Sequence, residues 1–190
     1  MQKLFIISGP SGAGEDSVIE GLARIMPIER VITTKTRAMR STESPGRPYY
    51  FITKDEFEAG IKDGKFFEYA QEYNDHYAGV THDEIQRVQA ADHIGIWKIE
   101  YKGVMSAKKM LGDKVCAIFI TAPLDVLEAR IRRREAVTDD FVAERMAYTR
   151  EWLAHKDIYD YEVENTEGEL EKTIVRVADI ITQERDGANN

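Results

Sequence analysis

A glycine-rich turn near the N-terminus has the residue types and spacing for binding phosphate. Residues 9–14 read Gly-Pro-Ser-Gly-Ala-Gly; they follow the apolar run 4–7 and precede a helical pattern at 16–25. Glycines let successive backbone N–H groups and the helix N-terminus face one anion. The spacing fits GxxxxGK[ST] except at the last two positions. We therefore predict a phosphate-binding loop made of Gly9, Pro10, Ser11, Gly12, Ala13, Gly14, Glu15, Asp16 and Ser17.

Two carboxylates invert the usual charge of this loop. Glu15 stands where the motif has lysine, and Asp16 stands where it has serine or threonine. A carboxylate within ~4 Å of a phosphate repels it by several kcal/mol at intermediate dielectric. Glu15 therefore needs a cation or a metal ion beside it. Asp16 can still face magnesium, which takes oxygen ligands.

Composition limits the classes of protein that can carry this loop. The 190 residues suit one domain with a small insertion, and 43% hydrophobic with 32% charged residues is typical of a globular chain. A net charge of −8 argues against general nucleic-acid binding. The single cysteine, Cys116, lies in an apolar run and is expected to be a buried thiol. No stretch resembles a signal peptide or a membrane span, so we expect a cytoplasmic protein without a membrane partner.

Apolar strand patterns alternate with helical patterns, which predicts a parallel sheet covered on both faces. We expect strands at 4–7, 27–34, 49–52, 65–73, 94–99, 115–121 and 161–164. We expect helices at 16–25, 54–62, 81–91, 104–111, 123–134, 138–155 and 167–184. Thr53 and Thr81 are predicted N-caps, and Glu84, three residues after Thr81, predicts a capping box. Residues 35–80 are expected to form a small mixed α/β insertion.

Four motifs, taken in order and spacing, resemble those of the guanylate kinase family over about residues 3–185. The first two are the loop at 9–14 and the run Thr-Thr-Lys-Thr-Arg-Ala-Met-Arg at 33–40, with Tyr49 and Phe51 after it. The last two are Phe-Phe-Glu-Tyr-Ala at 66–70, with Tyr77, and Arg-Ile-Arg-Arg-Arg at 130–134, with Arg145, Tyr-Asp-Tyr at 159–161 and Asn165. Each motif alone is moderate support, and together they are specific.

The resemblance implies phosphoryl transfer from ATP to GMP, with magnesium bound alongside ATP. It also implies a P-loop NTPase fold: a three-layer α/β/α core at 1–34, 81–122 and 156–185, a GMP-binding subdomain at about 35–80, and an arginine-rich lid at about 130–150. The partners would be ATP and GMP, and the protein would be a monomer or a homodimer.

Individual residues take roles from the same resemblance. Arg37 and Arg40 match arginines that hold the acceptor phosphate, for which the planar guanidinium is suited. Glu68 matches a carboxylate that accepts from guanine N1–H and the amino group, a donor pair that adenine lacks. The matched acceptor-site residues are Thr33, Arg37, Arg40, Tyr49, Glu68, Tyr77 and Glu100. Arg132, Arg134 and Arg145 match lid arginines at the transferring phosphoryl group, and Asn165 matches a residue near the ATP base.

The sequence departs from the family pattern where charge matters most. Lys98-Ile99-Glu100 stands where the family has Asp-Ile-Asp, so position 98 gained a positive charge while position 15 lost one. We expect the end of that strand to lie beside the loop, with Lys98 reaching the phosphates and Glu15 paired with Lys98 or a lid arginine. Asp16 is the predicted magnesium ligand. The loop at 76–80, His-Tyr-Ala-Gly-Val, also differs from the family pattern.

Two other functions fit parts of the sequence. Glu15 favours a non-catalytic guanylate-kinase-like module that binds GMP or a phosphopeptide, as in scaffold proteins. Asp16-Ser17 resembles the end of the loop in ribose 1,5-bisphosphate phosphokinase, which suggests another phosphorylated acceptor. Thr33 and Glu68 favour GMP as the acceptor.

Overall fold

The fold contains two β-sheets and seven α-helices among the residues that the computed structural model describes, 3–41, 43–71, 75–134 and 137–187, with the side chain of Arg134 left out. The strands are β1 (Leu4–Ser8), β2 (Ile28–Arg30), β3 (Thr33–Lys35), β4 (Ser44–Pro45), β5 (Pro48–Phe51), β6 (Phe66–Gln71), β7 (Tyr77–Thr81), β8 (Ile94–Trp97), β9 (Val115–Thr121) and β10 (Tyr161–Glu164). The helices are α1 (Glu15–Ile25), α2 (Lys54–Lys62), α3 (His82–Ala90), α4 (Tyr101–Leu111), α5 (Leu124–Arg134), α6 (Asp139–Leu153) and α7 (Leu170–Gly187).

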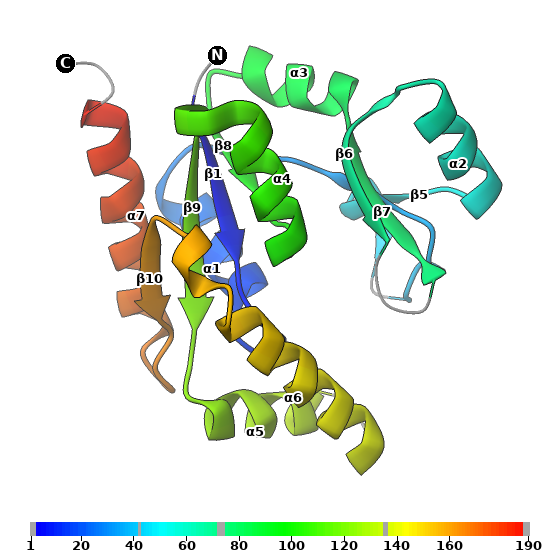
Figure 1. Cartoon of the computed structure of the whole chain (residues 1–190). Helices are drawn as coiled ribbons and strands as arrows, with labels where there is room; N and C mark the ends of the chain where they lie inside the picture. Colours follow the sequence, from blue (N-terminus) through cyan, green and yellow to red (C-terminus); the bar gives the residue numbers. More distant parts are fainter. Residues whose placement is uncertain (1–2, 42, 72–74, 135–136, 188–190) are drawn as a thin grey trace.

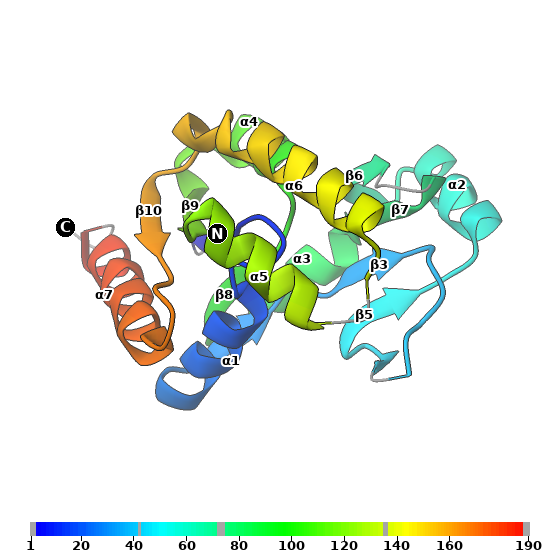
Figure 2. The same cartoon turned by 90° about the horizontal axis from the view of Figure 1, so that it is seen from below.

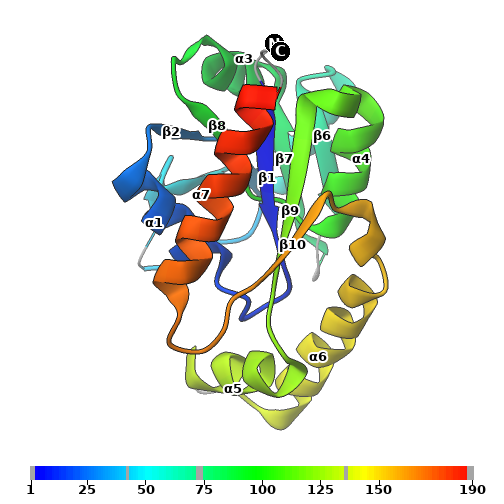
Figure 3. The ribbon, with the colours of Figure 1, turned by 90° about the vertical axis from the view of Figure 1, so that its left-hand side faces the viewer.

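The central sheet is parallel, in the order β10-β9-β1-β8-β2. Its three inner strands, β9, β1 and β8, are buried along their whole length, and alternate residues of β1 point into different cores. Phe5 and Ile7 pack with α1 and α7, whereas Leu4 and Ile6 pack with α3 and α4. Figures 1 and 3 show these helices on opposite sides of the sheet. The prediction of a parallel sheet covered on both faces is confirmed.

A second five-stranded sheet, in the order β4-β5-β3-β7-β6, lies beside the core with α2 (Figure 1). It runs from Thr33 to Thr81, close to the insertion expected at 35–80. The single strand expected at 27–34 is wrong. The chain leaves the central sheet after Arg30 and enters the second sheet at Thr33, so the segment forms two strands in different sheets.

Helices α5 and α6 pair at the end of the central sheet that bears the glycine-rich turn (Figure 2). Ile131 of α5 packs against Val142 and Met146 of α6. The other half of α6 is tied to the core: Trp152 Nε1 donates to the Tyr159 hydroxyl at 2.8 Å, which lies 2.9 Å from Ser8 Oγ at the end of β1. Helix α6 therefore connects the outlying α5 with the central sheet.

Helix caps show where local patterns were sufficient. Thr53 caps α2 in a capping box with Glu56, as a residue of this type at that spacing should. Thr81 caps α3, but the capping box predicted for Glu84 is wrong. The buried Glu84 carboxylate instead accepts from the backbone N–H of Ile32 at 2.7 Å and from Arg87. A tertiary contact to the chain between the two sheets has replaced the local one.

Two further expectations concern burial. Cys116 is 2% exposed in β9, as expected, and burial raises the pKa of its thiol to about 12, so it stays protonated at neutral pH. In the part of the chain that the structure describes, every helix is too short or too polar to cross a lipid bilayer.

Candidate functional site

One cleft of about 1210 Å³ joins the glycine-rich loop to the second sheet. Its volume exceeds the ~300–1,000 Å³ of a typical small-molecule pocket, which leaves room for two ligands of nucleotide size. Its walls bring together most of the predicted site residues: Gly9, Ser11, Gly12, Gly14, Glu15, Asp16, Ser17, Thr33, Arg37, Arg40, Tyr49, Glu68, Lys98, Glu100 and Arg145. The loop and Lys98 sit where β1 and β8 end, the edge at which parallel α/β sheets bind ligands.

The loop has the backbone shape that phosphate binding needs. Gly12 and Gly14 have φ of 89° and 96°, a region that other residues rarely enter. A Cβ on Gly9 would lie 2.3 Å from the carbonyl oxygen of Ile120, so any side chain there would displace the loop. Gly14 is the N-cap of α1, whose N-terminal N–H groups therefore open into the cleft.

Asp16, in the first turn of α1, forms ion pairs with two basic side chains. Lys98 Nζ donates to its Oδ2 at 2.6 Å, and Arg30 donates to its Oδ1 at 2.9 Å. Burial disfavours ionisation of this carboxyl, but Lys98 and Arg30 outweigh it and lower its pKa. The carboxylate predicted to face magnesium thus also anchors the lysine predicted to replace the missing one.

The charges of both carboxylates of the altered loop act on Lys98. Burial works against its charge, but Glu15 and then Asp16 more than compensate, and the pKa of Lys98 is raised. The ammonium therefore stays protonated at neutral pH. The charge of Glu15 therefore acts on Lys98, one of the two kinds of partner predicted for it, and pairing with a lid arginine stays a prediction.

Asn165 supports the loop from below. Its Nδ2 donates to the carbonyl of Ala13 at 2.7 Å, and its Oδ1 accepts from Thr173 at 3.3 Å. The side chain is 5% exposed and does not line the cleft, so the structure shows a contact with the loop, and contact with the ATP base stays a prediction. Pro10 and Ala13 are likewise loop residues outside the lining.

We expect Asn165→Asp to lower the free energy of unfolding by about 1–3 kcal/mol, because a second acceptor would face the Ala13 carbonyl in a buried site. Urea denaturation measures this. Glu164→Gln, an acid–amide exchange at an exposed position of the preceding strand, is the control and should be neutral. Equal stability of Asn165→Asp and wild type would show that the contact does not hold the loop.

The second sheet supplies the other half of the cleft. Thr33 and Glu68 are buried in its wall, 6% and 8% exposed, and Tyr49 lies beside them in register with Thr33. Arg37 is paired with Glu43 through two hydrogen bonds of 2.8 and 2.5 Å and stacks on Tyr49 at 5.4 Å. The hydrogen bond from Arg37 lowers the pKa of Glu43 to about 2. This wall therefore offers a fixed guanidinium near a buried carboxylate.

Two more predicted residues, Arg132 and Tyr77, also lie outside the cleft lining. Arg132 is on the exposed surface of α5, paired with Glu128 and Asp139. Two residues turn a helix by about 200°, so Arg130 faces the loop and Arg132 faces away. The Tyr77 ring stacks on Phe57 at 5.2 Å, because alternation along β7 turns it away from the face of Ala78. The side chain of Arg134 lies outside the described residues.

Among the lining residues that were not predicted for the site, three make contacts that shape it: Arg130, Arg30 and Glu43. Arg130 donates to the carbonyls of Gly12 and Asn165 at 3.2 and 2.9 Å. Arg130 belongs to the predicted arginine run, but the sequence alone does not show that Arg130, and not Arg132, faces the loop; that depends on the direction of α5. Arg30 and Glu43 had no sequence signal, since each gains its role from a partner outside its own element or turn of chain.

The sequence predicted a single protein ligand for magnesium, the Asp16 carboxylate. No three His, Cys, Asp or Glu side chains within the described ranges converge on a possible metal position. Magnesium usually binds one or two carboxylates and completes its shell with phosphates and water. Asp16 in the first turn of α1 fits that requirement, with a nucleotide supplying the other oxygens.

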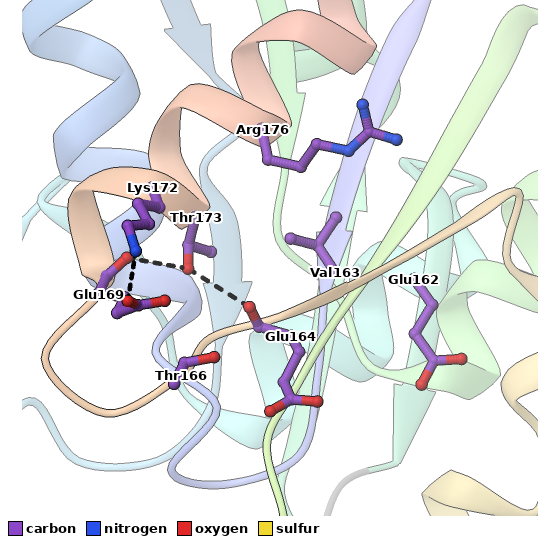
Figure 4. Close-up of a pocket in the computed structure, with 8 residues that line it drawn as sticks. All are labelled: Glu162, Val163, Glu164, Thr166, Glu169, Lys172, Thr173 and Arg176. Carbon is purple, nitrogen blue, oxygen red and sulfur yellow. Dashed lines mark hydrogen bonds and ion pairs between the residues drawn. The ribbon is translucent and has the colours of Figure 1, made fainter.

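A second hollow, of about 310 Å³, lies between β10 and α7 (Figure 4). It shares no lining residue with the cleft. Lys172 is paired with Glu169 there, and Thr173 Oγ1 lies 3.5 Å from the carbonyl oxygen of Glu164. The dashed lines in Figure 4 join only Lys172, Thr173, Glu169 and the Glu164 carbonyl, and we assign no ligand to this hollow.

The fold and the loop define an α/β protein of the P-loop NTPase type. The family model described as guanylate kinase matches residues 1–184, and the chain belongs to the guanylate kinase family. A guanylate kinase of Rickettsia felis is 34% identical over 187 residues, covering 97% of this chain and 95% of that protein. Guanylate kinase 2, chloroplastic/mitochondrial, of Oryza sativa subsp. japonica is 33% identical over 184 residues; the match covers 96% of this chain but 64% of the rice protein.

A solved structure gives the same fold. The guanylate kinase of Anaplasma phagocytophilum superposes with a TM-score of 0.76 over 97% of this chain and 86% of that one, at 24% identity. This similarity supports the two-sheet architecture and says nothing about the altered loop.

Proposed function

We propose that this protein transfers the γ-phosphoryl group of ATP to GMP, giving ADP and GDP. The observation that carries the proposal is one cleft that joins the glycine-rich loop to Thr33 and Glu68, the pair predicted to read guanine. Membership of the guanylate kinase family supports the same reaction. A GMP phosphate oxygen would attack the γ-phosphorus in line, forming one P–O bond as the bond to the β-phosphate oxygen breaks.

On the acceptor side, each residue has a defined task. Glu68 would accept from guanine N1–H and the amino group, with Thr33 beside it. Arg37, Arg40 and Tyr49 would hold the acceptor phosphate. Glu43 keeps the Arg37 guanidinium oriented on Tyr49, so little rotational freedom is lost when phosphate binds.

On the donor side, backbone N–H groups of the loop would hold the phosphates of ATP. Lys98 would supply the positive charge that position 15 lacks, and its raised pKa keeps that charge in place. Magnesium, when bound with ATP at Asp16, would neutralise phosphate charge. Arg145 lines the cleft from α6 and would act on the transferring group, and the same roles for Arg132 and Arg134 stay predictions.

Calorimetric titration of GMP, AMP and ATP separately, followed by a turnover assay with Mg-ATP and GMP, tests the proposal. We expect GMP to bind more tightly than AMP and ADP to appear only with an acceptor present. Tight binding of GMP without turnover would support the assignment of the acceptor site but contradict the proposed kinase activity. If ribose 1,5-bisphosphate displaced GMP and was phosphorylated faster, the acceptor substrate would be ribose 1,5-bisphosphate and not GMP.

Replacing Glu68 by Gln should weaken GMP binding by about 1–3 kcal/mol, because one acceptor becomes a donor facing guanine donors in a buried wall. Binding of ATP should be unchanged, as ATP occupies the other half of the cleft. The control is Glu58→Gln on α2, outside the cleft lining. If Glu68→Gln binds GMP as wild type does, guanine is read elsewhere.

A non-catalytic binding module is the second candidate, and Glu15 is the observation that favours it. A phosphopeptide would then occupy the Arg37 half of the cleft, and ATP would not bind. No turnover together with tight phosphopeptide binding would establish this function. A cytoplasmic monomer or homodimer without nucleic-acid or membrane partners stays a prediction in either case.

A further inference from the structure

Two reciprocal hydrogen bonds join α4 to α6. Tyr148 of α6 donates to Glu100 Oε2 at 2.8 Å, and Tyr101 of α4 donates to Glu151 Oε1 at 2.7 Å. We call them the inner pair and the outer pair. The tyrosine rings lie 6.1 Å apart and pack with Trp152. Each helix thus supplies one tyrosine and one carboxylate to the contact.

Only the inner pair reaches the cleft. Glu100 lines it, whereas Tyr101 and Glu151 do not. Glu100 is also the N-cap residue of α4, yet its side chain makes no cap hydrogen bond to that helix. The carboxylate is held from α6 instead. Burial and the charge of Glu100 raise the pKa of Tyr148, so its hydroxyl remains a donor at all working pH values.

We propose that Tyr148 is a positioning residue for the acceptor base: it would hold the Glu100 carboxylate, a matched acceptor-site residue in the cleft wall, in an orientation that accepts from guanine beside Glu68; this rests on the proposed function. An ionised carboxylate has about four acceptor sites on two oxygens, so one tyrosine hydroxyl leaves capacity for a base. The hydroxyl bond helps to fix the direction in which that capacity faces. Without it, Glu100 loses one of the contacts that orient it, and more of the entropy cost of ordering the carboxylate falls on base binding.

The inner pair also links the two substrates. Arg145 lies three residues before Tyr148 on α6, hence on the same helix face, and lines the same cleft. A base bound to Glu100 therefore restrains the helix that carries the arginine expected to act on the phosphoryl group. Occupancy of the acceptor site and placement of Arg145 become coupled through one hydrogen bond.

The test compares Tyr148→Phe with Tyr101→Phe, which remove the same atom from the same helix contact. We expect Tyr148→Phe to raise KM for GMP about tenfold, because a hydrogen bond to a charged group is lost. The ratio of kcat/KM for GMP to that for AMP should fall. KM for ATP should stay within twofold. Tyr101→Phe should leave both KM values unchanged while lowering the melting temperature as much as Tyr148→Phe does.

Each outcome decides the matter. Equal KM changes in the two variants, or an unchanged KM for GMP in Tyr148→Phe, would show that the inner pair is only a structural contact and would contradict the role proposed for Tyr148. The proposed function would still stand if the wild type phosphorylates GMP. A wild type that neither binds nor phosphorylates GMP overturns both. Calorimetric GMP affinity gives the same comparison without relying on the chemical step.

Discussion

Replacing Lys98 by alanine should lower kcat for GMP phosphorylation about 100-fold, comparable with removing one preorganised donor from a developing charge. The ammonium is protonated, lines the cleft, donates to Asp16 and is stabilised by the charge of Glu15. Its loss removes a phosphate-binding cation and leaves two carboxylates in the first turn of α1 facing ATP, with Arg30 as a remaining partner for Asp16. Both changes raise the free energy of the transition state.

Initial rates with Mg-ATP and GMP at saturation measure this effect. Lys108→Ala is the matched control: it removes another lysine ion pair, between α4 and Asp160, with no contact to the cleft. Thermal unfolding of both variants separates lost catalysis from lost folding. A Lys98→Ala enzyme as active as wild type would show that no lysine has been relocated.

Much of the fold could be predicted from residue patterns because its elements are locally determined. The continuous apolar runs of β1 and β9 indicate strands buried on both faces, and both lie in the parallel sheet. Thr53 and Glu56 make their capping box within four residues. The capping box predicted for Thr81 and Glu84 was wrong because of a distant partner. The Glu84 carboxylate accepts instead from the backbone N–H of Ile32, where the chain passes between the two sheets.

The residues of the candidate site also fall into those that local motifs predict and those whose contacts depend on tertiary packing. Loop residues and the buried Glu68 could be found from motif spacing, since motifs keep a fixed register with their element. The direction of α5 could not, and it brings Arg130 to Gly12 while turning Arg132 to solvent. Nor could the bond of Arg30 with Asp16 be found, because it depends on how β2 lies against α1.

The proposed charge exchange between positions 15 and 98 would explain why two substitutions that each look harmful can coexist. Asp16 gains two cations and Lys98 gains two carboxylates, so the ionised groups in this part of the cleft are mutually compensated. A loop that had merely lost its lysine would hold Glu15 without such a partner. Compensation of this kind predicts that neither position can be reverted alone.

Reverting Glu15 to lysine should therefore reduce, not restore, ATP binding. The new ammonium would face Lys98, and two like charges about 4 Å apart repel by about 4 kcal/mol at an effective dielectric of 20. Lys98 would also lose the charge that contributes most to raising its pKa. We expect both the calorimetric affinity for Mg-ATP and kcat to fall below the wild-type values.

The double variant Glu15→Lys with Lys98→Asp places both charges in the arrangement typical of the family and should recover part of what each single change removes. Because the two positions interact, the two effects should not add; the four proteins form a cycle that isolates their coupling, provided the loop keeps its shape. Additive losses would mean that Glu15 and Lys98 act independently. A single Glu15→Lys variant that binds ATP more tightly than wild type would identify the loop as a decayed site, and the exchange between Glu15 and Lys98 would then have no functional meaning.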